Sequence, residues 1–89
     1  MKIYRINNTD TYLLVYAQRD WYSGRDKYHV WNGSYQVDLA PDKSHVWFIQ
    51  PGTKKKIIAD YVRDVPKYIT NNKKLSYNEI LNRCLKGKN

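Results

Sequence analysis

Three consecutive lysines, Lys54, Lys55 and Lys56, are the residues of this chain whose type and spacing best suit a chemical task. They follow Gly52, and the apolar residues after them recur at helical spacing, so the sequence predicts a helix over residues 53–65 with the lysines in its first turn. A helix N-terminus carries about half a positive charge, so each exposed lysine there is unfavourable by about 0.3–1 kcal/mol. Free backbone N–H groups beside ammonium groups form a phosphate site. We therefore predict that this cluster binds a polyanion.

The three lysines differ in the partners that the expected helix offers them. Lys56 stands four residues before Asp60, a spacing at which opposite charges meet on a helix. Lys54 and Lys55 have no such partner, so the phosphate prediction rests mainly on these two. The alternative interpretation is a solvated helix start that binds no ligand.

A second group of candidate residues lies in the polar segment that follows this helix. Lys67, Lys73 and Lys74 flank an asparagine-rich connector that also carries Tyr68. Cations that track a backbone and a ring that stacks a base are the elements of single-strand recognition. We predict that these four residues extend the nucleic-acid surface. The alternative is a loop that the charges merely keep in solvent.

The net charge of +8 is unevenly distributed over the 89 residues. Residues 1–53 hold six cations against five acidic residues, whereas residues 54–89 hold ten cations against three. Such an asymmetry favours a nucleic acid or an acidic protein surface as the partner. A purely solubilising surface is the alternative.

Catalytic and metal-binding patterns are weak in this sequence. His29 and His45 could act as the base and acid of a metal-independent ribonuclease, with a lysine or arginine stabilising the transition state. The single cysteine, Cys84, and two isolated histidines show no metal-ligand spacing. Phosphate-binding glycine loops and nucleophile motifs are also missing from the sequence. We predict a protein without enzymatic activity, metal or cofactor, and keep the ribonuclease as an alternative.

The aromatic residues are the other candidates for contact with bases. Trp21, Trp31 and Trp47, with the strand tyrosines, could form a base-stacking platform. A chain of this length needs most of its large aromatic side chains in the core, and Trp47, which stands within an apolar run, is predicted to be buried. Trp21 and Tyr22 stand beside a glycine-containing loop, and we expect them to be exposed.

Strands in the first half of the chain must position several of these residues. Apolar and β-branched runs separated by turn residues predict about five strands within residues 1–50. The second strand carries apolar residues on both faces, which predicts that both of its faces are covered. Asn32-Gly33-Ser34 between the third and fourth strands predicts a tight hairpin. The expected strands are residues 2–6, 11–19, 27–31, 35–39 and 45–50.

Helices are expected in the second half of the chain. Ser76 and Glu79 form a capping box, which predicts a helix over residues 76–86. Together with the helix over residues 53–65, the element order predicts a single α+β domain, residues 1–89. Its architecture would be an antiparallel sheet of about five strands followed by two C-terminal helices.

Two resemblances bear on the function. The stretch Thr53-Lys54-Lys55-Lys56 after a sheet resembles the double-stranded-RNA-binding domain, in which a sheet leads into a helix opened by Lys-Lys-x-Ala-Lys whose lysines contact phosphates. The whole chain, short, basic and rich in Lys, Asn and Tyr, resembles the small early proteins of T4-like phages. In size and charge it is similar to the ToxN-inhibiting factors of such phages, the TifA type. That similarity implies an RNA-binding counter-defence factor that blocks a host endoribonuclease toxin in an RNA-containing complex.

The sequence thus predicts a non-enzymatic RNA-binding protein. The expected partners are RNA and a host endoribonuclease toxin, and the alternative is a protein–protein inhibitor of an acidic host factor that acts without RNA. No apolar run reaches the length of a transmembrane helix, and no signal-peptide pattern follows the N-terminus. We therefore expect a cytoplasmic protein with no membrane partner, located in the host cell if a phage encodes it.

Overall fold

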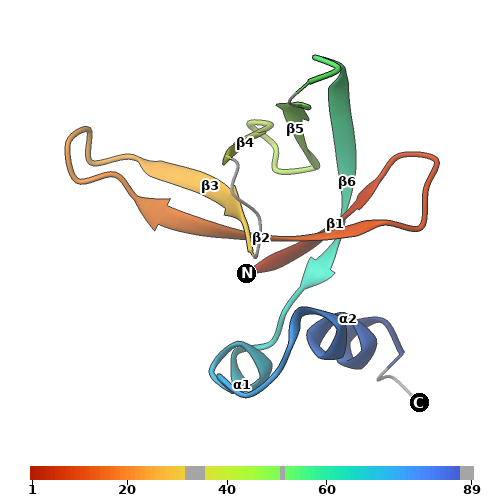
Figure 1. Ribbon diagram of the computed structural model, residues 1–89. Helices are drawn as coiled ribbons and strands as arrows, with labels where there is room; N and C mark the ends of the chain where they lie inside the picture. The colour runs from red at the N-terminus through yellow and green to blue at the C-terminus, as the bar shows by residue number, and fades with distance from the viewer. Residues whose placement is uncertain (32–35, 51, 87–89) are drawn as a thin grey trace.

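The computed structural model describes residues 1–31, 36–50 and 52–86. The elements of these residues are β1 (Lys2–Ile6), β2 (Tyr12–Arg19), β3 (Asp26–Val30), β4 (Gln36–Leu39), β5 (His45–Ile49), β6 (Lys56–Asp64), α1 (Lys67–Thr70) and α2 (Tyr77–Lys86). Each strand pairs antiparallel with the next, and β6 pairs with β1, so the six strands form a closed barrel. Both helices lie together below β1 and β2 in the view of Figure 1.

The five strands expected within residues 1–50 are confirmed, and their described ends differ from the prediction by at most one residue. Side-chain alternation explains them: in β5, Val46 and Phe48 face the barrel interior and are buried, whereas Trp47 faces outward. β3 and β4 pair as expected, with Tyr28 opposite Val37. The turn predicted at residues 32–34 lies outside the described residues.

The helix predicted over residues 53–65 is wrong, because residues 56–64 form β6. The Gln50 N–H donates to the Lys55 carbonyl at 2.8 Å and closes a turn that leads back along β5. β6 then pairs with β5 on one edge and with β1 on the other. Tertiary pairing on both edges overrides the local spacing of apolar residues. The resemblance to the double-stranded-RNA-binding domain depends on a helix that begins at these lysines, and residues 56–64 form a strand instead.

Apolar side chains on both faces of β6 account for the helix-like spacing, since Ile57 packs against the barrel core and Ile58 lies opposite Trp47 on the outer face. A β-bulge follows near the end of the strand. Ile3 lies opposite Arg63 and Tyr4 lies opposite Tyr61, so Val62 is left without a facing residue on β1. One extra residue moves the inward-facing positions by one place along the strand. The apolar residues of the two faces, taken together, recur in steps of one and three, as on a helix, although the chain is extended.

Two hydrophobic clusters lie on opposite faces of β1 and β2. The barrel core consists of Tyr4, Leu13, Val15, Val30, Val37, Val46, Phe48 and Ala59. The helix core consists of Ile3, Leu14, Val65, Ile69, Leu75, Ile80 and Cys84. β2 thus buries residues on both faces, as its apolar pattern predicts, and the helices cover its outer face.

The helix predicted over residues 76–86 is confirmed as α2, and the Glu79 N–H donates to the Ser76 hydroxyl at 3.2 Å as expected for its N-cap. Tyr77 fixes this helix to β2. Its hydroxyl donates to the Tyr12 carbonyl at 2.6 Å and accepts from the Leu14 N–H at 3.2 Å. Residues 67–70, expected within a connector, form the short helix α1.

The barrel interior is filled by side chains. A cavity of about 90 Å³ remains at one mouth, lined by Tyr4, Val15, Tyr28 and their neighbours. Small barrels are packed cores rather than pores, and this cavity is smaller than ordinary ligand pockets of about 300–1,000 Å³. A ligand of nucleotide size must therefore bind on the outside of the barrel or on its loops.

Candidate nucleic-acid interface

The three candidate lysines lie in the turn between β5 and β6 and at its exit into β6, and we call residue 50 and residues 52–56 the basic turn. The side chains of Lys54, Lys55 and Lys56 are all exposed. Because the segment is not a helix, neither a helix dipole nor free helix amides contribute, and that part of the phosphate-site argument is wrong. The basic turn supplies three neighbouring ammonium groups instead.

Local hydrogen bonds hold the backbone of the basic turn. The Lys54 N–H donates to the Gln50 carbonyl at 2.9 Å, and the Thr53 hydroxyl donates to Gln50 Oε1 at 3.1 Å. Gly52 has φ +91° and Lys54 has φ +56°. A left-handed conformation costs a residue other than glycine roughly 1–2 kcal/mol. The chain thus keeps a lysine where glycine fits the backbone better, as it also does at Lys43, which has φ +63°.

Replacing Lys54 with glycine is expected to raise the free energy of unfolding by about 0.5–1 kcal/mol, because glycine adopts positive φ without steric cost. Urea denaturation measures this change. Lys54→Asn is the matched control, since asparagine also tolerates the left-handed region and also removes the charge. A loss of stability in both variants would show that the ammonium group itself stabilises the turn.

Lys56 lies over an aromatic ring on the outer surface of the barrel. Its Nζ is 4.6 Å from the centroid of the Trp47 ring, which is within the range of a cation–π interaction. The prediction that Trp47 belongs to the core is wrong, because its side chain is half-buried on the outward face of β5. The pair expected between Lys56 and Asp60 depends on a helical turn; in an extended strand the two residues are roughly 13 Å apart.

Two isoleucines adjoin this cation–π pair. Trp47 faces Ile58 and Ile49 faces Lys56 across the β5–β6 ladder, and the side chain of Ile49 is 52% exposed. We call Trp47, Ile49, Lys56 and Ile58 the outer platform. Sequence reasoning missed the isoleucines as surface residues, and the signal that finds them is the two-residue alternation of β5 and β6 once both are assigned as strands.

The second group of candidates lies at the other end of β6. Lys67 and Tyr68 belong to α1, and Lys73 and Lys74 precede α2; all four are exposed, Tyr68 to 76%. β6 has nine residues, and the eight steps between its first and last residues, at about 3.3 Å each, separate this group from the basic turn by roughly 26 Å. The structure therefore brings the seven candidates together as two groups at opposite ends of one strand.

An open groove of about 790 Å³ adjoins the α1 group. Its lining residues are Met1, Lys2, Asp64, Val65, Pro66, Lys67, Thr70 and Asn71. The Lys2 ammonium is paired with Asp64 at 2.7 Å, which reduces the positive charge that this groove can offer to an anion. Lys67 is the other cationic side chain of the lining.

The two histidines are not arranged for a shared reaction. His29 lies opposite Gln36 on β4, and His45 lies where β5 meets Ala40. Two strand spacings across the sheet and four residues along β4 place the two Cα atoms roughly 16 Å apart, whereas an acid and a base must both reach the same phosphodiester. His45 Nδ1 is 3.1 Å from the Ser44 hydroxyl, which donates to Asp42 at 2.7 Å. In a hydrolase triad the histidine lies between the serine and the carboxylate. Here Ser44 lies between Asp42 and His45, so these hydrogen bonds do not form such a triad.

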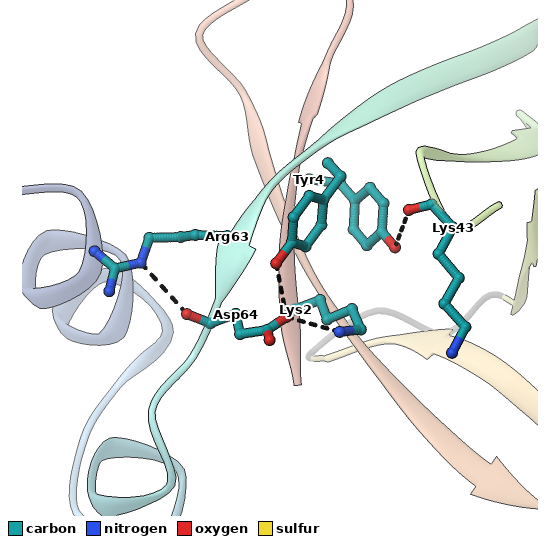
Figure 2. A network of polar contacts seen from close by, with 6 residues as sticks. Lys2, Tyr4, Lys43, Arg63 and Asp64 are labelled. Carbon is teal, nitrogen blue, oxygen red and sulfur yellow. Dashed lines mark hydrogen bonds and ion pairs between the residues drawn. The ribbon is translucent and has the colours of Figure 1, made fainter.

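A polar network ties the start of β1 to the end of β6 (Figure 2). Asp64 Oδ1 accepts from Lys2 Nζ at 2.7 Å and from the Tyr61 hydroxyl at 2.9 Å. These two donors, Lys2 first, hold the pKa of the Asp64 carboxyl below its usual range. In the same region the Arg63 guanidinium donates to the Cys84 carbonyl at 2.6 Å and joins β6 to α2.

Asp64→Asn is expected to lower the stability at pH 7 by at most about 1 kcal/mol, since exposed ion pairs contribute little. The folded-state pKa of Asp64 is lowered, so its contribution is present above the unfolded value of about 3.9 and is lost as the pH falls below it. The variant should therefore lose less stability than the parent between pH 7 and pH 3, as measured by urea denaturation. Lys2→Met should reproduce the effect, and equal acid sensitivity in all three proteins would contradict the assignment.

No family model, curated protein or solved structure matches the chain. Among the described residues, no group of three or more His, Cys, Asp or Glu side chains is close enough to hold a metal ion. Within the same part of the chain, no helix has the length and apolar character needed to cross a bilayer.

Proposed function

We propose that this protein binds RNA without enzymatic activity and that the basic turn makes its phosphate contacts. The observation that carries the proposal is the Lys56–Trp47 pair beside Lys54 and Lys55. One small area there offers three cations, an indole ring and the exposed side chain of Ile49. Single-strand binding proteins combine a cationic track with aromatic rings in this way.

Two further arguments support the outer platform as the binding surface. The barrel interior is packed, so bases must be met from outside. Other small barrels bind oligonucleotides on the outer face of the sheet, an analogy of fold that supports the choice of surface and not the function itself.

We propose that Lys67, Tyr68, Lys73 and Lys74 extend the contact for longer RNA. One strand with the base stacking of a duplex places a phosphate about every 3.4 Å along its axis, so the roughly 26 Å between the two groups corresponds to roughly eight stacked nucleotides. An extended strand spans the same distance with fewer nucleotides. Shorter RNA would engage only one of the two groups.

The affinity for single-stranded RNA of about ten nucleotides is expected to fall with salt. Contact with roughly four to six phosphates of a single strand gives a slope of about −3 to −4 in a plot of log affinity against log salt concentration. Fluorescence anisotropy of labelled RNA at several salt concentrations measures it, and a flat response contradicts phosphate binding. Nucleic acid that co-purifies with the protein and is removed by RNase but not by DNase distinguishes RNA from DNA.

We also propose a biological role as a phage counter-defence factor that inhibits a host endoribonuclease toxin within an RNA-containing complex. The resemblance in length, charge and composition supports this role. Co-expression with such a toxin should restore growth, and the complex should fall apart on RNase treatment. If growth is restored equally by Lys54→Glu/Lys55→Glu and the complex resists RNase, the protein is an inhibitor that acts by protein contacts alone.

A further inference from the structure

The turn between β2 and β3 exposes two aromatic side chains that neither core uses. Trp21 is 83% exposed and Tyr22 is 88% exposed, with ring centroids 5.3 Å apart and planes tilted by 34°. This turn lies at the end of a hairpin that projects from the barrel, at the left of Figure 1. A buried ring of this kind removes about 150–250 Å² from water, so two rings left in solvent are better explained by a ligand than by folding.

The turn that carries these rings is held by its own hydrogen bonds. The Asp20 N–H donates to the Arg25 carbonyl at 2.8 Å, and the Gly24 N–H donates to the Asp20 carbonyl at 2.7 Å. The Ser23 hydroxyl donates to Asp20 Oδ2 at 2.8 Å and accepts from the Arg25 N–H at 3.2 Å. Gly24 has φ +72°, a conformation that glycine adopts without strain. A turn ordered before binding loses little conformational entropy when a ligand arrives.

A groove of about 240 Å³ adjoins Trp21 on the surface of this hairpin. Its lining residues are Gln18, Arg19, Asp20, Trp21, Lys27 and His29. The indole is the one large apolar surface among an amide, a guanidinium, a carboxylate, an ammonium and an imidazole. A flat ligand with hydrogen-bonding edges and a negative charge suits this lining, and a nucleotide has both.

We propose that this hairpin tip is a nucleobase-binding site for single-stranded RNA. Unpaired bases stack on Trp21 and Tyr22, and Arg19 and Lys27 approach the adjoining phosphates. Lys27 Nζ is 3.7 Å from Asp20 Oδ2, a long ion pair that leaves the ammonium group accessible. The inference rests on the proposed RNA binding and adds to it that the RNA is unpaired, because bases inside a duplex offer no free ring face.

The outward faces of β3, β4 and β5 connect the tip to the outer platform. His29 faces Gln36 across β3 and β4, and Asp38 faces Trp47 across β4 and β5. The His29 ring stacks on Tyr16, with centroids 5.7 Å apart. A strand bound at both ends would cross this surface, and the Asp38 carboxylate would direct its phosphates away from the middle of it.

The lining also favours a base over a protein segment. Hot spots for protein partners are aromatic side chains in well-packed pockets that exclude water. Here both rings stand in solvent, and the groove beside Trp21 is lined by charged and polar side chains. A protein partner at this tip is the competing outcome in the following test.

The test compares Trp21→Leu/Tyr22→Leu, which keeps apolar bulk but removes the ring faces, with Trp21→Phe/Tyr22→Phe, which keeps them. Anisotropy with single-stranded RNA of about ten nucleotides should show about 5- to 100-fold weaker binding for the leucine variant and nearly parental binding for the phenylalanine variant. The salt slope should stay unchanged, since no charge is altered. The parent protein should bind a duplex of the same length more weakly than the single strand.

The outcomes separate this inference from the proposed function. A leucine variant that binds RNA like the parent, with a steep salt slope, overturns the base site and leaves RNA binding intact. Equal affinity for duplex and single strand also overturns it. Complete absence of RNA binding by the parent overturns both proposals. A leucine variant that keeps its RNA affinity but no longer binds a toxin partner assigns the tip to a protein contact.

Discussion

Replacing Tyr4 with alanine is expected to lower the free energy of unfolding by about 3–5 kcal/mol. Tyr4 is among the largest of the fully buried side chains and belongs to the barrel core. Its ring meets the edge of Tyr61 at a centroid distance of 5.7 Å, which joins β1 to β6 where the barrel closes. A domain of this size has a total stability of about 0.05–0.15 kcal/mol per residue, so the variant would lose a large share of it.

Thermal denaturation followed by circular dichroism measures this loss, and a fall in Tm of at least about 12 °C is expected. Tyr4→Phe is the matched control. It keeps the ring and removes only the hydroxyl, which donates to the Lys43 carbonyl at 3.4 Å (Figure 2), so it should cost at most about 1.5 kcal/mol. Equal losses in both variants would show that the hydrogen bond, and not the packing of the ring, stabilises the closure.

The segment that closes the barrel is also where sequence and structure differ most. β1 to β5 follow from alternation and turn residues that lie within each segment, and α2 follows from the Ser76–Glu79 cap. β6 is decided by its neighbours, because apolar residues on both of its faces, Ile57 and Ile58 among them, give a helical repeat in place of alternation. The residues within one segment of a sequence do not indicate that other strands will pair with both of its edges. The same tertiary information decides that the sheet is a closed barrel.

The exposure of several candidate residues was predictable from the sequence, and their arrangement in space was not. The exposure of Trp21, Tyr22 and Tyr68 agrees with their positions beside glycine or in a polar segment. The cation–π contact of Lys56 with Trp47 was not predictable, because it joins two strands of which one was expected to be a helix. The lysine cluster remains the candidate phosphate site because its three side chains are exposed and Lys56 lies over the Trp47 ring.

Charge reversal at the basic turn, Lys54→Glu/Lys55→Glu/Lys56→Glu, is expected to weaken binding of single-stranded RNA by about 100-fold at low salt, since three phosphate contacts become repulsive. The salt slope should become shallower by about 2, or about 0.7 for each lost contact with a single strand. The three side chains are exposed, so the fold should persist in circular dichroism. Anisotropy with RNA of about ten nucleotides measures both quantities.

The matched control is Lys67→Glu/Lys73→Glu/Lys74→Glu, which changes the net charge by the same amount at the other end of β6. General attraction between a basic protein and RNA would make the two triple variants equally weak. A local site at the basic turn instead makes the first variant much weaker than the second. If the second variant instead binds RNA much more weakly than the first, the phosphate contacts lie at α1 and the turn before α2. The outer platform is then not the RNA-binding surface. The comparison therefore separates position from charge, which the sequence alone cannot do.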